Sequence, residues 1–183
     1  MKKRFLCLIL ALALALGGCS APIFGTAAPT APPAPTVRYV VTLAALNDSG
    51  VTGTVTMTRA GDILTVSVTL AGATPNQQHM QHIHGSHDTI ATCPPASAAS
   101  AAGIITLAAG TPYYGPVALP LEPTPTADAT GKISWTESIA LSSSDDYAMA
   151  PLTQHVVLIH GMMYHGAYDQ VMPAACGTIQ QVK

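Results

Sequence analysis

The sequence from residue 37 to residue 70 alternates apolar and polar side chains with a period of two residues. Three such runs follow one another, and their apolar members are Val37, Tyr39, Val41 and Leu43, then Val51, Val55 and Met57, then Leu64, Val66, Val68 and Leu70. Short polar segments at 47–50 and 60–62 separate the runs. Successive side chains of a β-strand point to opposite faces, so this pattern predicts an antiparallel meander with one buried face.

Five further short runs predict five more strands, at 80–84, 113–121, 132–141, 155–160 and 175–182. Pro116 and Pro120 lack an amide hydrogen, which places the second of these runs at a sheet edge. The segments expected outside strands are the loops 85–111 and 161–173 and a helical turn within 142–151. Eight short strands without a long helix predict an all-β, eight-stranded antiparallel sandwich or flattened barrel.

The first nineteen residues have the features of an export signal. A basic start at 1–4 is followed by an apolar run at 5–16, which is too short to span a bilayer, and by two glycines. The segment 16–19, Leu-Gly-Gly-Cys, resembles the lipobox of bacterial lipoproteins, in which the cysteine carries the lipid. We therefore expect a signal peptide at 1–18, a lipid on Cys19 and an anchor in a membrane of the cell envelope.

The segment 19–36 is rich in alanine, proline and threonine. Such a segment cannot bury a core and is expected to form an extended, polyproline-like tether. The globular domain is then expected to occupy residues 37–183, on the extracytoplasmic side of the membrane.

Charge is scarce in this chain. Asp, Glu, Lys and Arg make up 9% of the residues, with seven basic and nine acidic side chains in total. Loss of residues 1–18 removes three of the basic residues and leaves a net side-chain charge of −5. Nucleic-acid binding needs a basic patch, so this composition argues against a nucleic-acid partner.

Two of the four cysteines belong to the exported domain. Cys7 lies in the signal peptide and Cys19 in the lipobox, which leaves Cys93 and Cys176. In an oxidising compartment these two are expected to form one disulfide.

Histidine is concentrated in two segments. Four of the seven histidines fall at 79–87, and the other three fall at 155–165. In a strand, His82 and His84 would project from one face while Ile83 points into the core. If His160 from the second segment meets this pair, the three imidazoles provide a ligand set suited to copper or zinc.

Taken singly, the other histidines have a simpler interpretation. Each of His79, His87, His155 and His165 can serve as a solvated or hydrogen-bonded side chain, because neutral imidazole both donates and accepts a hydrogen bond.

Several short motifs, in order, resemble those of copper-zinc superoxide dismutases and of bacterial lipoproteins grouped with them and with CHRD domains. The motifs are His-Ile-His-Gly at 82–85, Cys-Pro-Pro at 93–95, Tyr-Gly-Pro-Val at 114–117, the strand ending in His160, and Ala-Ala-Cys-Gly at 174–177. The resemblance covers residues 37–183.

The resemblance implies an eight-stranded Greek-key β-sandwich. The positions that match copper ligands of the family are His82, His84 and His160. The resemblance also implies that Cys93 pairs with Cys176, and that Leu158 lines the approach to the metal.

The sequence also departs from the family. The family places a bridging histidine and a zinc-binding cluster in its long loop, whereas 89–111 contains no His, Asp or Glu. A zinc site of that type is therefore not expected. The candidates for a missing fourth copper ligand are His79, His87 and His165. Pro173 stands where the family has an arginine that guides the anionic substrate.

These observations predict an anchored, superoxide-dismutase-like domain that binds copper and has weak or lost dismutase activity. Two alternatives remain open at this point. One is an active copper-only dismutase with an altered fourth ligand, and the other is a metal-free, CHRD-like surface module for binding or scaffolding. Zinc held by three histidines for hydrolysis is disfavoured, because no general base is evident.

Overall fold

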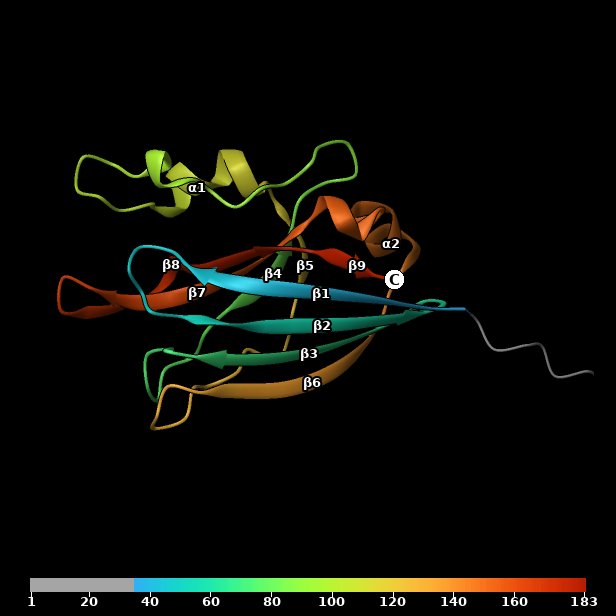
Figure 1. The fold of residues 1–183 in the computed structure, drawn as a ribbon, viewed down its shortest axis with the longest axis horizontal. Helices are drawn as coiled ribbons and strands as arrows, with labels where there is room; N and C mark the ends of the chain where they lie inside the picture. Colours follow the sequence, from blue (N-terminus) through green and yellow to red (C-terminus); the bar gives the residue numbers. More distant parts are fainter. Residues whose placement is uncertain (1–34) are drawn as a thin grey trace, which may run out of the picture. The chain divides into compact units, whose positions relative to one another are not determined.

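The computed structural model describes residues 35–183, which form nine strands and four short helices (Figure 1). The strands are β1 (Thr36–Ala45), β2 (Thr52–Ala60), β3 (Ile63–Ala71), β4 (Gln81–His84), β5 (Val117–Pro120), β6 (Ile133–Ala140), β7 (Val156–Tyr164), β8 (Ala167–Thr178) and β9 (Gln180–Val182). The helices are α1 (Leu107–Tyr114), α2 (Ser143–Met149) and the 3-10 turns Ala96–Ala98 and Leu152–Gln154. None of these helices is long and apolar enough to cross a membrane.

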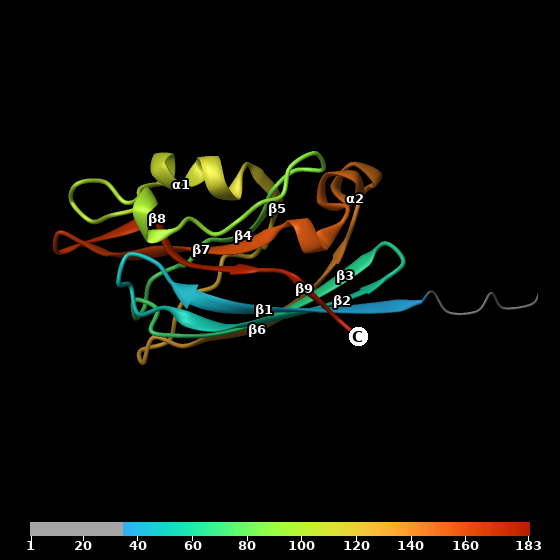
Figure 2. The same ribbon diagram turned by 45° about the horizontal axis from the view of Figure 1, so that its top comes forward.

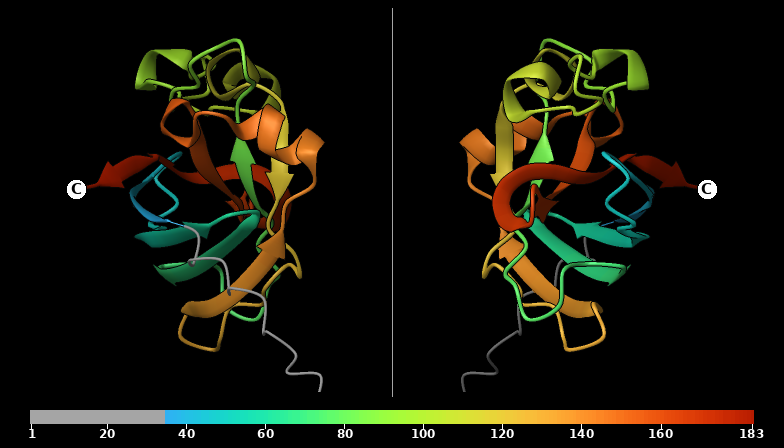
Figure 3. Two further views of the ribbon diagram at one scale, coloured as in Figure 1. Left: turned by 90° about the vertical axis from the view of Figure 1, so that its right-hand side faces the viewer. Right: turned by 90° about the vertical axis from the view of Figure 1, so that its left-hand side faces the viewer.

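The strands form one strongly curled antiparallel sheet that encloses the core (Figures 2 and 3). Their order is β5-β4-β7-β8-β1-β2-β3-β6, and β9 also pairs with β1. Strands distant in the sequence are therefore neighbours, most notably β4 and β7. This arrangement confirms the predicted all-β sandwich or flattened barrel.

The predicted alternation is reproduced by the burial of the first three strands. Val41, Val55 and Val66 are each fully buried, and they belong to one central core together with Ile83 and Val157. The intervening threonines and serines of β2 and β3 lie on the other face and are more exposed. Period-two burial in all three strands confirms the predicted meander.

A second, smaller apolar cluster lies on the opposite face of β7. Val156 and Leu158 pack there with Tyr114 and Cys176, while Val157 and Ile159 point into the central core. The segments around α1 cover this outer face, and α1 contacts β8 (Figure 1). The histidines discussed below share this outer face.

Three of the predicted elements differ from the structure in detail. The run 113–121 is not one strand, because residues up to Tyr114 complete α1 and β5 begins only at Val117. Thr106 caps α1 by accepting a hydrogen bond from the amide of Ala109, a helix start that the proline-rich pattern concealed. The helical turn predicted within 142–151 is confirmed as α2, which begins with a capping box between Ser142 and Asp145.

The segment 161–173 was predicted to be a loop but is a β-hairpin. Strand β7 continues to Tyr164, and β8 begins at Ala167. The reversal uses the left-handed conformation at His165 (φ 50°) and Gly166 (φ 81°), so two residues suffice for the turn. The predicted last strand, 175–182, is divided between β8 and β9.

The predicted signal peptide, lipidated Cys19 and most of the tether lie outside the described residues. The predicted disulfide lies within them, and Cys93 is bonded to Cys176. This bond joins the long segment after β4 to β8 and closes a loop with a sequence separation of 83 residues.

Replacement of both cysteines by alanine is expected to lower the free energy of unfolding by roughly 4 kcal/mol, because the unfolded chain regains the freedom of that long loop. Urea denaturation of the two proteins measures the difference. A change below about 1 kcal/mol would show that loop closure contributes little here.

Candidate metal centre

The β4–β7 ladder brings two remote histidine segments together. His82 of β4 pairs with Leu158 of β7, and Gln81 pairs with Ile159. The next residue of β7, His160, donates its backbone N–H to the carbonyl of Met80 over 2.8 Å. His160 therefore lies beside the strand that carries His82 and His84.

A register shift at His160 aims its side chain. The β7–β8 pairing is irregular between Ile159 and His160 and again between His160 and Met162, as in a β-bulge. Gly161 occupies this irregularity with φ 100°, and a Cβ there would meet the Tyr168 hydroxyl at 2.0 Å. Glycine is therefore required immediately after His160.

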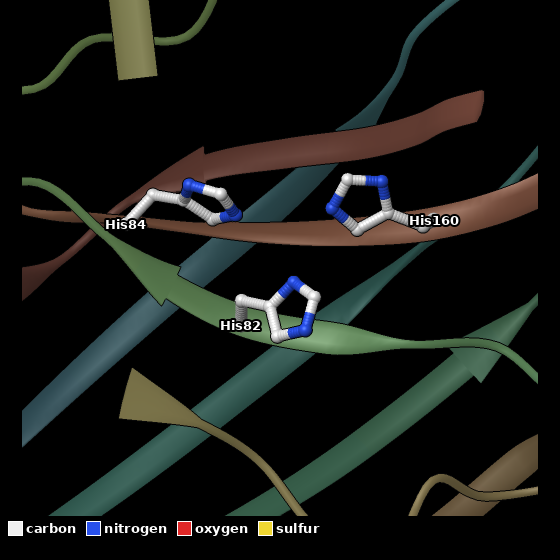
Figure 4. Close-up of side chains that lie close together, drawn as sticks. All are labelled: His82, His84 and His160. Atoms are coloured by element: carbon white, nitrogen blue, oxygen red, sulfur yellow. The ribbon is translucent and has the colours of Figure 1, made fainter. Parts of the chain in front are cut away.

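The three rings face a common space (Figure 4). One nitrogen from each of His82, His84 and His160 lies within 4.8 Å of the others. The ring centroids are 5.4 Å apart for His82 and His84, 5.2 Å for His82 and His160, and 5.9 Å for His84 and His160. Metal–imidazole bonds are about 2.0–2.1 Å long, so ring movements on the order of 1 Å would allow all three to reach one ion.

Backbone carbonyls fix the orientation of two rings. His84 Nδ1 donates to the carbonyl of Gly115 over 3.0 Å, and His160 Nδ1 donates to the carbonyl of Val171 over 2.8 Å. A proton on Nδ1 leaves the lone pair on Nε2. Metal-binding histidines are commonly oriented by such a bond from the second ring nitrogen.

Each of the three rings also has one buried nitrogen without a hydrogen-bond partner. His82 Nδ1, His84 Nε2 and His160 Nε2 are buried and make no hydrogen bond. Figure 4 shows these three atoms on the sides of the rings that face one another. Burying a polar atom without a partner costs about 1–3 kcal/mol, so three in one place need an explanation. A metal ion that accepts three lone pairs fits these atoms.

Burial also holds the rings in the neutral form that ligates metals. Loss of hydration lowers the pKa of His84 and of His160 to about 4. The hydrogen bond from each ring to its backbone carbonyl raises the pKa and opposes part of this shift. The pKa of His82 is also lowered by burial, and the negative charge of Glu122 opposes that shift. At neutral pH the three lone pairs are therefore available.

The other four histidines do not belong to this group. Among residues 35–183, the only group of three or more His, Cys, Asp or Glu side chains with this geometry contains His82, His84 and His160. His79 and His155 are fully buried with both ring nitrogens against backbone carbonyls. His87 bonds the Ala150 carbonyl and stacks on Tyr147, and His165 forms the β7–β8 turn.

His79 and His155 instead support the centre. His79 Nδ1 lies 3.0 Å from the carbonyl oxygen of His160, within hydrogen-bonding distance. The His155 ring lies against Gly85, where an added Cβ would come within 2.6 Å of it. These two histidines therefore support the backbone directly after His84 and His160. The sequence feature that could have indicated this role is the glycine that follows each of those residues.

An aromatic and aliphatic wall borders the centre. Tyr114 is 1% exposed, and its ring meets that of His84 edge to face with centroids 4.8 Å apart. Leu158 lies opposite His82 and packs with Tyr114 in the outer cluster. Sequence reasoning anticipated Leu158 but not Tyr114, because the segment containing Tyr114 was assigned to a strand.

No family model matches this sequence, and no curated protein does. Among solved structures, superoxide dismutase 5 of Candida albicans in its Cu(II) form is similar, with a TM-score of 0.51 and 15% identity, over 81% of this chain and 94% of that one. A variant of the same Candida protein gives a TM-score of 0.50 at 15% identity, over 81% and 93%. The chain has a superoxide-dismutase-like fold. At this identity the likeness concerns the fold alone.

The metal-free protein is expected to lose stability as the pH falls from about 6.5 toward 4. In this window the unfolded chain binds protons on residues 84 and 160 that the folded chain does not, because their folded pKa is about 4. Each histidine then contributes a loss of up to roughly 3 kcal/mol near the lower limit. Urea unfolding with a chelator present, at several pH values, measures this slope.

The matched control is the double variant His84→Asn, His160→Asn. Asparagine can still donate to the carbonyls of Gly115 and Val171 but has no titrating ring. Its stability should change less between pH 6.5 and 4. An unchanged slope would assign the effect to groups other than these two histidines.

Proposed function

We propose that this protein is an extracytoplasmic, lipid-anchored copper-binding protein with a superoxide-dismutase-like fold. The observation that carries the proposal is the convergence of three buried, unpartnered ring nitrogens, from His82, His84 and His160. Copper is the metal proposed because imidazoles bind it well and because it lies at the top of the affinity order for divalent first-row metals. The resemblance of the three positions to copper ligands of the family supports the same choice.

We propose further that dismutase activity is weak or lost. Dismutation requires the capture of an anion, and the protein offers little positive charge for this, with a net charge of −5 after loss of residues 1–18. Pro173 occupies the position at which the family has its guiding arginine. The segment 89–111 has no His, Asp or Glu from which a family-type zinc site could be made.

The proposed location rests on two features. The Cys93–Cys176 disulfide suits an oxidising compartment outside the cytoplasm. The signal-like start and the segment ending at Cys19 support a lipid anchor in the membrane, with 19–36 as the tether. Labelling with a radioactive fatty acid, lost in Cys19→Ala, tests the anchor.

The purified protein is expected to bind one equivalent of copper, and His160→Asn is expected to weaken that binding by at least about 100-fold. Loss of even an outer partner of a metal site can cost 10- to 100-fold, and this change removes a ligand atom while retaining a donor to the carbonyl of Val171. Titration calorimetry with Cu(II), and electron paramagnetic resonance of the bound ion, measure both quantities.

The control is His165→Asn, which alters a histidine in the β7–β8 turn outside the three-histidine group. It should bind copper as the unaltered protein does. Absence of stoichiometric binding at micromolar copper, or equal weakening by both substitutions, would overturn the proposal and favour the metal-free, CHRD-like binding module.

The copper-loaded protein is expected to show no more superoxide consumption than an equal concentration of free copper ions. A stopped-flow superoxide assay makes this comparison, with the His160→Asn protein as the blank. Activity well above free copper, lost in that variant, would instead establish an active copper-only dismutase.

A further inference from the structure

Strand parity places a methionine on the face that carries the three rings. Side chains alternate along a strand, and the odd-numbered residues of β4 point inward, since Ile83 is fully buried in the central core and Gln81 accepts a hydrogen bond from Trp135 Nε1. The even-numbered positions, His82 and His84, project from the other face. Met80 directly precedes β4 and has the same parity.

Pairing across strands gives the same placement independently. The backbone N–H of His160 donates to the carbonyl of Met80, one step beyond the Gln81–Ile159 pair. Residues directly opposite in an antiparallel ladder share a face, with Cβ atoms about 4.5–5.5 Å apart. Met80 is thus the cross-strand neighbour of His160 and two residues from His82. It is only partly buried.

The other described methionines near β7 lie elsewhere. Met162 and Met172 belong to the central core, and Met163 is 50% exposed on the β7–β8 hairpin. Methionine has three rotatable bonds and a polarisable thioether that reaches into irregular spaces. Side-chain parity along β4 and backbone pairing with His160 both place Met80 on the face of the three rings.

We propose that Met80 supplies its thioether as a fourth ligand to the three-histidine centre, and that the centre thereby favours Cu(I) over Cu(II). This inference rests on the copper binding proposed above and names the oxidation state of that same site. Thioether sulfur is a soft ligand that selects Cu(I), whereas imidazole accepts both states.

The charge of the site favours the same state. The three-histidine group contains no carboxylate or thiolate, so its ligands do not neutralise a bound ion. His84 and His160 are only 4% and 2% exposed, and an uncompensated charge is costly at such a site. The negative charge of Glu122 acts on one member of the group, His82. One oxygen of that carboxylate already accepts hydrogen bonds from the amide and the hydroxyl of Thr124. Cu(I) brings one positive charge into this site, whereas Cu(II) brings two.

The decisive comparison is between the unaltered protein, Met80→Leu and Met163→Leu. Leucine keeps an apolar side chain of similar size without sulfur, and Met163→Leu removes an exposed sulfur elsewhere. Anaerobic competition with the Cu(I) chelator bicinchoninate gives the Cu(I) affinity, and calorimetry gives the Cu(II) affinity. We expect Met80→Leu to lower Cu(I) affinity on the order of tenfold, with little change for Cu(II) and none in Met163→Leu.

A tenfold selective loss of Cu(I) affinity corresponds to a fall of about 59 mV in the reduction potential of this one-electron couple, which voltammetry reads directly. X-ray absorption of the unaltered, Cu(I)-loaded protein should show one sulfur neighbour besides nitrogen. This last measurement does not depend on whether the variant folds.

The outcomes separate the two proposals. Copper bound with nitrogen neighbours only, or equal Cu(I) affinity in Met80→Leu and the unaltered protein, overturns the role of Met80 and leaves the three-histidine copper site standing. No binding of copper in either oxidation state overturns both.

Discussion

The pairing of β4 with β7 is the constraint on which the rest of the molecule depends. These strands lie more than seventy residues apart in the sequence, yet their register places His160 next to the strand of His82 and His84. A slip of one residue would turn Ile83 outward and both β4 histidines into the apolar core. Burial of Ile83 and Val157 on the inner face therefore fixes the positions of imidazoles on the outer face. The same contacts that stabilise the sandwich also align the candidate ligands.

The periodic part of this structure was predictable from the sequence, because strict alternation leaves one choice of buried face. That reasoning placed Ile83 inside and His82 and His84 together on the other face, as observed. It failed where local patterns conflicted with long-range contacts. Residues 107–111 were assigned to a loop and 113–114 to the next strand, but a threonine cap and packing on β8 make this stretch one helix. The β7–β8 hairpin was missed because its reversal needs only two residues, one of them a histidine in a conformation more common for glycine.

The grouping of the three histidines was predictable from the sequence, but the contacts that support it were not. The spacing of the histidines suggested which rings could meet, whereas nothing in the sequence indicated that the carbonyls of Gly115 and Val171 would orient two of them. A backbone carbonyl can be supplied by any residue type, so its role leaves almost no trace in the sequence. What the sequence does retain is steric: glycine follows both His84 and His160, and at each position an added Cβ would strike a ring or a hydroxyl.

The arrangement of the rings is costly without an ion, and this cost links metal binding to folding. Three buried nitrogens without partners disfavour the metal-free native state, each by about 1–3 kcal/mol. An ion that binds only the native state repays such a cost and adds stability that grows with the logarithm of its free concentration. The disulfide between Cys93 and Cys176 opposes the cost of the unpartnered nitrogens. It restricts the unfolded chain, and so favours the native state, whether or not an ion is present. Because this restriction of the unfolded chain does not depend on an ion, the disulfide offsets part of the cost of keeping three unpartnered imidazole nitrogens buried.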